Sequence, residues 1–265
     1  MKLRRACVLA VCAVLLLTCT ASRRAAHPTP PASPTQAAPS GVLLVLAASP
    51  LKPAFDQLRT GFAAAHPGVT VTATYQGSQA LATAVQAGAQ ADVFAGTDPA
   101  VMAALKGSGA VVSSTVATFA RIHLQLVVPA GNPKSIGTLD DLAKPGVSFV
   151  VADPSLPAGR DARLALARAG IRSSPKFVEP SVAFVLTTVL AGNADAGIAY
   201  ESDIVGGSSG LTGVAIPAGQ DVPVDCQIAV LQNSPNPTAA EAFVQSVLSG
   251  AGRSTLQASG FLPPA

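Results

Sequence analysis

Cysteine is scarce in this chain beyond its first twenty residues. Three of the four cysteines, Cys7, Cys12 and Cys19, lie in that opening segment, which leaves Cys226 alone. A single cysteine cannot form an intramolecular disulfide or a cysteine-based metal site. The three histidines stand far apart in the sequence and have no acidic partner at ligand spacing, so neither a zinc centre nor a catalytic triad is predicted.

Positive charge is also scarce once the first forty residues are set aside. The whole chain has 17 basic and 14 acidic residues, but five of the basic residues precede Gly41. The 12 basic residues that remain face all 14 acidic ones, which gives this part a net charge of −2. Because nucleic acid is bound through basic patches, this charge balance excludes a nucleic-acid partner.

The first forty residues have the pattern of an export leader. Basic residues at positions 2, 4 and 5 precede the uncharged apolar stretch Ala6–Leu17, which is too short to span a bilayer. We therefore predict a signal peptide over residues 1–18. The sequence LLTC ending at Cys19 resembles a lipobox, although Thr18 departs from the usual small residue, and residues 19–40 form a tether rich in Pro, Ala and Ser. These features predict lipidation of Cys19 and attachment to the outer face of the cell membrane.

Beyond residue 40, apolar runs alternate with helical patterns of 10 to 15 residues, which is typical of βαβ units and a mostly parallel sheet. Glycine follows several of the helices, as expected at their C-terminal ends. Open sheets of this kind bind ligands beyond the carboxyl ends of their strands. Strands are predicted at 42–47, 69–75, 92–95, 121–129, 147–152, 195–199, 213–216 and 226–231, and helices at 50–65, 78–87, 98–106, 159–169, 181–191 and 238–249.

Two serines stand where an apolar strand runs into a helix, Ser49 after VLLVLAA and Ser78 after VTVTATYQG. The first turn of a helix carries N–H groups without an intrahelical partner, and the helix dipole places partial positive charge there. A serine at the N-cap adds a hydroxyl to this end. Capping the helix is the commoner role of such a serine. Two such ends that face each other nevertheless predict a site for a small tetrahedral dianion that needs no Lys or Arg.

Five segments of the chain carry motifs in a distinctive order: AASP around Ser49, YQGSQALATAVQAGAQADVFAGTD from Tyr75, DPSLPAG from Asp153, EPSVAFVLTTVLAGNADAGIAYESD from Glu179, and LQASGFLPP near the C-terminus. Together they resemble the ModA family, the molybdate-binding proteins of bacterial molybdate ABC transporters. The resemblance extends from Val42 to Leu262, and the second segment is its most specific part.

The resemblance implies a type II periplasmic-binding-protein fold, an α/β fold with two lobes and the ligand in the cleft between them. Lobe I would comprise residues 41–123 and 224–265, and lobe II residues 124–223. It also implies ligand contacts from the amides and hydroxyls of Ser49 and Ser78, the amides of Ala158 and Val182, and the phenol of Tyr200. Pro50 and Pro53 predict that the first helix begins with one more residue than is usual in the family.

The function that the resemblance implies is binding of molybdate or tungstate outside the cytoplasm and delivery to the permease and ATPase subunits of an ABC importer. Such a protein would be a monomer without a cofactor, and no side chain would ligate the metal directly. A receptor for another oxyanion, such as sulfate or phosphate, is the alternative. A secreted enzyme on the same fold is more remote, because no histidine accompanies the serines and the carboxylates are scattered.

Overall fold

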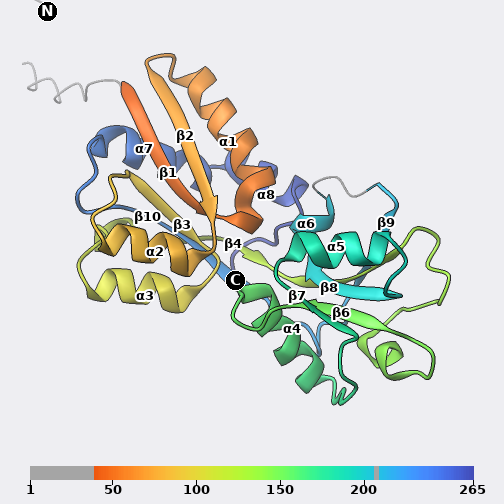
Figure 1. Ribbon diagram of the computed structural model, residues 1–265. Coiled ribbons are helices and arrows are strands. Elements are labelled where there is room, and N and C mark those ends of the chain that lie inside the picture. The colour runs from red at the N-terminus through yellow and green to blue at the C-terminus, as the bar shows by residue number, and fades with distance from the viewer. Residues whose placement is uncertain (1–38, 206–208) are drawn as a thin grey trace, which may run out of the picture. The chain divides into compact units, whose positions relative to one another are not determined.

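Two five-stranded sheets form the framework of the computed structural model, which describes residues 39–205 and 209–265 (Figure 1). The first sheet, with the helices around it, is lobe I, and the second is lobe II. In lobe I the strand order is β2 (Val69–Gln76), β1 (Gly41–Ala48), β3 (Val93–Gly96), β10 (Val224–Val230) and β4 (Ala117–Ile122). In lobe II it is β7 (Phe177–Glu179), β6 (Phe149–Ala152), β8 (Ala196–Tyr200), β5 (Leu124–Pro129) and β9 (Leu211–Ala215).

Helices pack on both sides of the lobe I sheet (Figure 1). On one side lie α1 (Lys52–Ala65), α7 (Pro237–Leu248) and α8 (Gly250–Ala258), and on the other α2 (Ser78–Gln86) and α3 (Pro99–Gly107). Lobe II has α4 (Pro157–Arg168), α5 (Val182–Leu190) and the short α6 (Glu201–Val205). Single 3-10 turns complete the list: η1 (Ser49–Leu51), η2 (Ser113–Thr115) and η3 (Leu139–Ala143).

The core of lobe I follows from the spacing of apolar residues along α1. Its buried side chains, Ala54, Phe55, Leu58 and Phe62, recur at the three- and four-residue intervals of one helix face. The Phe55 ring packs at a tilt against Phe119 with ring centroids 5.7 Å apart, and Phe62 packs edge-on against Phe243 with centroids 5.3 Å apart. These aromatic pairs hold α1 against the sheet and against α7, so the beginning of α1 is held in a fixed place.

The predicted α/β, two-lobed fold is confirmed, but the sheets are less parallel than the sequence predicts. Four of the eight strand pairings are parallel and four are antiparallel. All four antiparallel pairings involve β5 or β10, the strands with which the chain enters lobe II and returns to lobe I. Parallel pairing needs a helix that carries the chain back along the sheet before the next strand, and a strand reached by such a crossing has no such helix before it. The local pattern of apolar residues does not show the direction of a strand in its sheet.

Four other elements differ from the sequence prediction. The single strand predicted over 121–129 is two strands, β4 and β5, which lie in different sheets and are separated by His123 alone. The elements β7, α6 and α8 were not predicted, because two of them are only three and five residues long and α8 follows α7 after one residue. No helix within residues 39–205 and 209–265 is long and apolar enough to cross a membrane.

A partly buried polar cluster lies where the chain crosses between the lobes. His123 is the residue of the first crossing, and Asp221 lies in the segment 216–223 that leads into the second. The His123 ring contacts the Glu201 carboxylate through Nε2 and lies 3.6 Å from the Asp221 carboxylate through Nδ1. The Asp221 and Glu201 carboxylates raise the pKa of His123, and they outweigh the opposite effect of burial. The protonated ring is therefore tied to both carboxylates at the crossings.

This cluster predicts a pH-dependent contribution to stability. The pKa of His123 is higher in the folded state than in the unfolded state, so its stabilising effect is complete below about pH 6.5 and is lost as pH rises through the folded-state pKa. We expect His123→Gln to lower the free energy of unfolding more at about pH 6 than at about pH 9. Denaturant unfolding of both proteins at the two pH values measures this, and an equal loss at both would contradict it.

Candidate ligand-binding site

The five residues that the sequence singles out line one cavity of about 390 Å³. Ser49 and Ser78 contribute from lobe I, and Ala158, Val182 and Tyr200 from lobe II. The same cavity is lined by other residues of these segments, among them Gly77, Thr97, Pro180, Ser181 and Asp203. A cavity between two lobes is a usual place for a small-ligand site. The structure thus brings together all five residues from segments far apart in the sequence.

The two serines are not N-caps, which corrects the sequence prediction. Ala48 caps the 3-10 turn that begins at Ser49, and Gly77 caps α2, which begins at Ser78. Neither cap makes a side-chain hydrogen bond to its helix. The serines occupy the first helical position, where the backbone N–H still has no intrahelical partner. Both serines therefore combine an available amide with a hydroxyl that is not used for capping.

A 3-10 turn lies where the sequence predicts an extra residue at the start of the first helix. Ser49, Pro50 and Leu51 form η1, and the regular α1 begins at Lys52. Pro50 is the second residue of this turn. The N–H groups of the first helical turn have no intrahelical acceptor, so a proline at this position loses no helical hydrogen bond. The side chain of Leu51 is fully buried and fixes the turn in the core. Ser49 consequently stays at the carboxyl end of β1.

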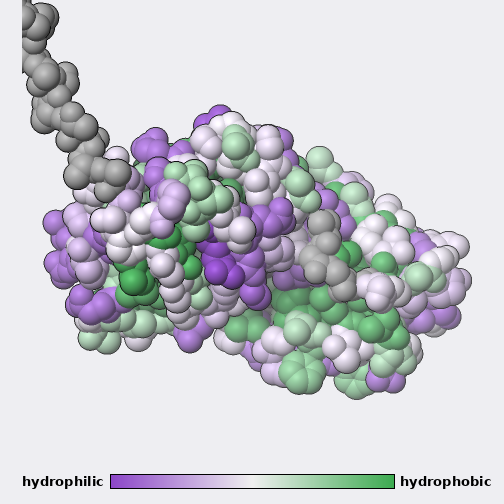
Figure 2. Space-filling model, turned by 90° about the horizontal axis from the view of Figure 1, so that it is seen from above, coloured by the Kyte–Doolittle hydropathy of each residue, from purple (hydrophilic) through white to green (hydrophobic). Residues whose placement is uncertain are grey.

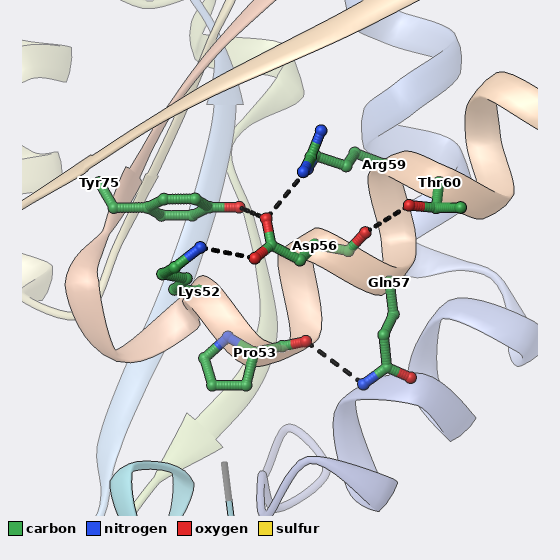
Figure 3. A network of polar contacts seen from close by, with 7 residues as sticks. All are labelled: Lys52, Pro53, Asp56, Gln57, Arg59, Thr60 and Tyr75. Carbon is green, nitrogen blue, oxygen red and sulfur yellow. Dashed lines mark hydrogen bonds and ion pairs between the residues drawn. The ribbon is translucent and has the colours of Figure 1, made fainter. Parts of the chain in front are cut away.

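A polar network beside the cavity joins α1 to the end of β2 (Figure 3). The Asp56 carboxylate accepts from Lys52 Nζ at 2.6 Å, from Arg59 Nε at 2.9 Å and from the Tyr75 hydroxyl at 2.9 Å. Burial opposes ionisation of Asp56, but these three donors outweigh it and lower its pKa. Tyr75 lies three residues before Ser78, so the network holds together the two segments that carry Ser49 and Ser78.

The start of α4 and the start of α5 form the lobe II wall of the cavity. Helix α4 begins at Pro157, two residues earlier than predicted, so Ala158 lies inside the first turn and is buried. Val182 is the first residue of α5, and the preceding Ser181 caps the helix by accepting from Phe184 N at 3.4 Å. Among the described residues, no group accepts a hydrogen bond from the amide of Ala158 or of Val182. Both amides are free to donate to a ligand.

Tyr200 ends β8 and is 1% exposed. Its phenol donates to Asp161 Oδ2 at 2.7 Å, and its backbone N donates to Asp203 Oδ2 at 3.2 Å. Burial, together with the neighbouring Asp161 carboxylate, raises the pKa of Tyr200 well above its usual value, so the phenol keeps its proton. Burial also raises the pKa of Asp161, against the lowering effect of the Tyr200 hydrogen bond, and raises that of Asp203 to about 6.

Three residues near the cavity were missed by the sequence prediction. Asp161 is the acceptor of the Tyr200 phenol, and Thr97 lines the cavity at the end of β3. Arg160 Nη2 donates to Asp98 Oδ2 at 2.8 Å, which joins α4 of lobe II to the N-cap of α3 in lobe I. Only Thr97 had a local signal, because it follows an apolar strand as Ser49 does. The other contacts join residues 39 to 62 positions apart.

The cavity is suited to an anion although no basic side chain lines it. Its described lining contains no Lys, Arg or His, and Asp203 is its one acidic residue. The N-termini of α2, α4, α5 and the turn η1 open onto it. Helix N-termini offer free N–H groups and partial positive charge, and charge-assisted hydrogen bonds from such donors are strong. Among the described residues no cluster of His, Cys, Asp or Glu could hold a metal ion.

Two lobes joined by two chain crossings, with helix N-termini around a cavity between them, define a two-lobed solute-binding protein. Residues 43–262 match the family model of bacterial extracellular solute-binding proteins. The chain is 40% identical over 234 residues to the molybdate-binding protein ModA of Mycobacterium tuberculosis, covering 88% of each. It therefore belongs to the bacterial extracellular solute-binding protein family and, within it, to the ModA family.

Solved structures agree with this fold. The periplasmic molybdate-binding protein of Azotobacter vinelandii matches with a TM-score of 0.73 at 20% identity, covering 84% of this chain and all of that one. The sulfate-binding protein SubI of Mycobacterium tuberculosis also matches with a TM-score of 0.73, at 21% identity. The match covers 84% of this chain and 86% of the SubI chain. At these identities the likeness shows the fold alone, and the fold is shared by receptors for different oxyanions.

Proposed function

We propose that this protein binds molybdate outside the cytoplasm and delivers it to the permease and ATPase subunits of an ABC importer, and that tungstate binds in the same way. The observation that carries the proposal is the convergence of helix N-termini on a cavity without basic side chains. The 40% identity to a ModA protein over most of the chain supports molybdate in particular. The family supports a binding role, and the proposal includes no catalytic step.

The proposed donors from lobe I are the amides and hydroxyls of Ser49 and Ser78. Lobe II would add the amides of Ala158 and Val182 and the phenol of Tyr200. Four oxygens, at about the 30 Å³ that a water molecule takes in the liquid, fill roughly 120 Å³. The cavity is about 390 Å³, so the two lobes would close around the anion by a hinge motion at the crossings.

Tyr200 has one hydroxyl hydrogen, and the phenol donates it to Asp161. The hydrogen can turn to an anion when Asp161 is protonated, because the carboxylic acid then donates to the phenol oxygen. Burial raises the pKa of Asp161, which favours this form, and a dianion in the cavity would favour it further. In this proposal Tyr200 donates its hydroxyl hydrogen to the bound anion, and protonated Asp161 donates a hydrogen bond to the Tyr200 oxygen.

The alternative is a receptor for sulfate or phosphate, which the fold of the SubI structure permits. A smaller anion would leave some donors out of reach. Protonated phosphate would bring a hydroxyl into a site made mostly of donors, where it finds few acceptors. Both considerations favour molybdate and tungstate over these two anions.

A panel of oxyanions tests the proposal. A ligand at a thousand times its dissociation constant adds about 4 kcal/mol to the free energy of unfolding, which raises the melting temperature of a domain of this size by roughly 10 °C. We expect micromolar molybdate and tungstate to produce such a rise in the purified protein. An equal rise with equimolar sulfate, or no rise with molybdate, would reject the molybdate assignment.

Docking to a permease and attachment to the membrane are further parts of the proposal. On the face that Figure 2 shows, hydrophobic residues gather on lobe II. The exposed large apolar side chains of lobe II include Phe177, Val178, Phe184 and Leu190, each at least 42% exposed. Such a surface suits contact with a partner protein.

The signal peptide, the tether and Cys19 lie outside the described residues, so lipidation stays a prediction. Palmitate incorporation that depends on Cys19 would test it.

A further inference from the structure

A third hydroxyl lies with those of Ser49 and Ser78 at the carboxyl ends of neighbouring strands. The three strands are parallel and adjacent in the order β2, β1, β3. Strand β1 leads into Ser49, β2 leads through Gly77 into Ser78, and β3 leads directly into Thr97. Ala47 of β1 pairs with Ala95 of β3 in parallel register, and two residues further along both strands this register sets Thr97 opposite Ser49. Thr97 also lines the cavity.

The Thr97 hydroxyl is buried without a hydrogen-bond partner. The residue is 1% exposed, and Oγ1 has no partner within the described part of the chain. A buried hydroxyl without a partner is destabilising, and such groups are rare in folded proteins. Thr97 lines the cavity, and its hydroxyl lacks a partner in the described part of the protein, so this hydroxyl is a candidate to bind an oxygen of the ligand when the lobes close around it.

The backbone of Thr97 is fixed beside Ser78. Thr97 N donates to Ser78 Oγ at 3.1 Å, and both residues are almost fully buried. Because Ser78 Oγ accepts this hydrogen bond, its own hydrogen remains available to an acceptor in the cavity. The contact therefore orients Ser78 as a donor and holds the Thr97 side chain next to it.

We propose that Thr97 binds the oxyanion directly, donating a hydrogen bond from Oγ1. This inference rests on the proposed function and adds a donor to the set that the family resemblance implies. One more donor also strengthens the preference for a fully deprotonated anion over one that carries a hydroxyl.

The decisive variant is Thr97→Val, which keeps the shape of the side chain and removes the hydroxyl. We expect its affinity for molybdate, measured by calorimetry on the purified protein, to fall roughly 10- to 150-fold, because a hydrogen bond to a charged group is lost. Thr97→Ser retains the hydroxyl and is expected to bind within about threefold of the parent. Thr97→Ala provides a second hydroxyl-free variant if valine does not fold.

Stability of the ligand-free protein separates binding from a structural role. Removing a buried hydroxyl that has no partner is neutral or stabilising, so Thr97→Val should melt at the parent temperature or above it. Ser202→Ala is the matched control, because Ser202 Oγ is also buried without a partner in the described residues but does not line the cavity. It should leave affinity unchanged.

The outcomes distinguish this inference from the proposed function. Parent protein that binds none of the oxyanions would reject the proposed function and this inference with it. Parent protein that binds molybdate, with Thr97→Val or Thr97→Ala equal to it in affinity, would reject the role of Thr97 alone. A loss of affinity in Thr97→Val matched by an equal loss in Thr97→Ser would also reject it, because the hydroxyl would then not be the cause.

Discussion

Gly159→Ala is expected to lower both the stability of the protein and its affinity for the ligand. A Cβ at this position would lie 2.2 Å from the carbonyl oxygen of Asp153 and 2.4 Å from that of Ala152. Both contacts are with backbone, so the first turn of α4 must move away from the end of β6. Overpacking of this kind costs about 1–3 kcal/mol in stability. Because the same turn carries Ala158, the affinity for molybdate should fall by more than about tenfold.

Gly61→Ala is the matched control for this prediction. Gly61 lies inside α1, is exposed, and has no atom within 4 Å of where its Cβ would lie. Alanine there should stabilise the protein by about 0.5–1 kcal/mol through helix propensity and leave binding unchanged. Thermal unfolding and calorimetry measure both effects. Gly159→Ala protein that melts and binds like the parent would show that α4 does not depend on this close approach.

Val182→Pro is expected to fold and to lose about 10- to 150-fold in affinity. The first position of a helix accepts proline, and Ser181 before it has the extended backbone that a residue preceding proline adopts. No described residue accepts a hydrogen bond from the Val182 amide, so its removal breaks no internal contact. The amide is proposed to bind the anion, and a hydrogen bond to a charged group contributes about 1.5–3 kcal/mol.

Val182→Ala separates the amide from the side chain, since it keeps the N–H and removes only two methyl groups. It should bind within a few-fold of the parent, as measured by calorimetry. Equal binding by Val182→Pro and the parent would remove Val182 from the site. Ser78→Ala is a less direct test, because it also takes the acceptor from Thr97 N and so lowers stability together with affinity.

The sequence predicted more of the site than of the sheets. Ser49 and Ser78 could be identified because each follows an apolar strand and begins a helix, a pattern confined to a few consecutive residues. Ala158, Val182 and Tyr200 could be identified only through the family resemblance, since alone they have the pattern of packing residues. The division of residues 121–129 between two sheets was not predicted, because His123 interrupts neither the apolar pattern nor the extended backbone.

The sequence by itself determined the class of the protein through its resemblance to the ModA family. It also determined the βαβ elements and the strand ends that carry Ser49 and Ser78, because these depend on short-range patterns of apolar, glycine and serine residues. The tertiary structure decided which residues share the cavity. It brought Asp161 to the Tyr200 phenol and Arg160 to Asp98, and it left the Thr97 hydroxyl buried at the end of β3. These relations depend on contacts between segments far apart in the chain, which form only when the two lobes have folded and no local pattern encodes them.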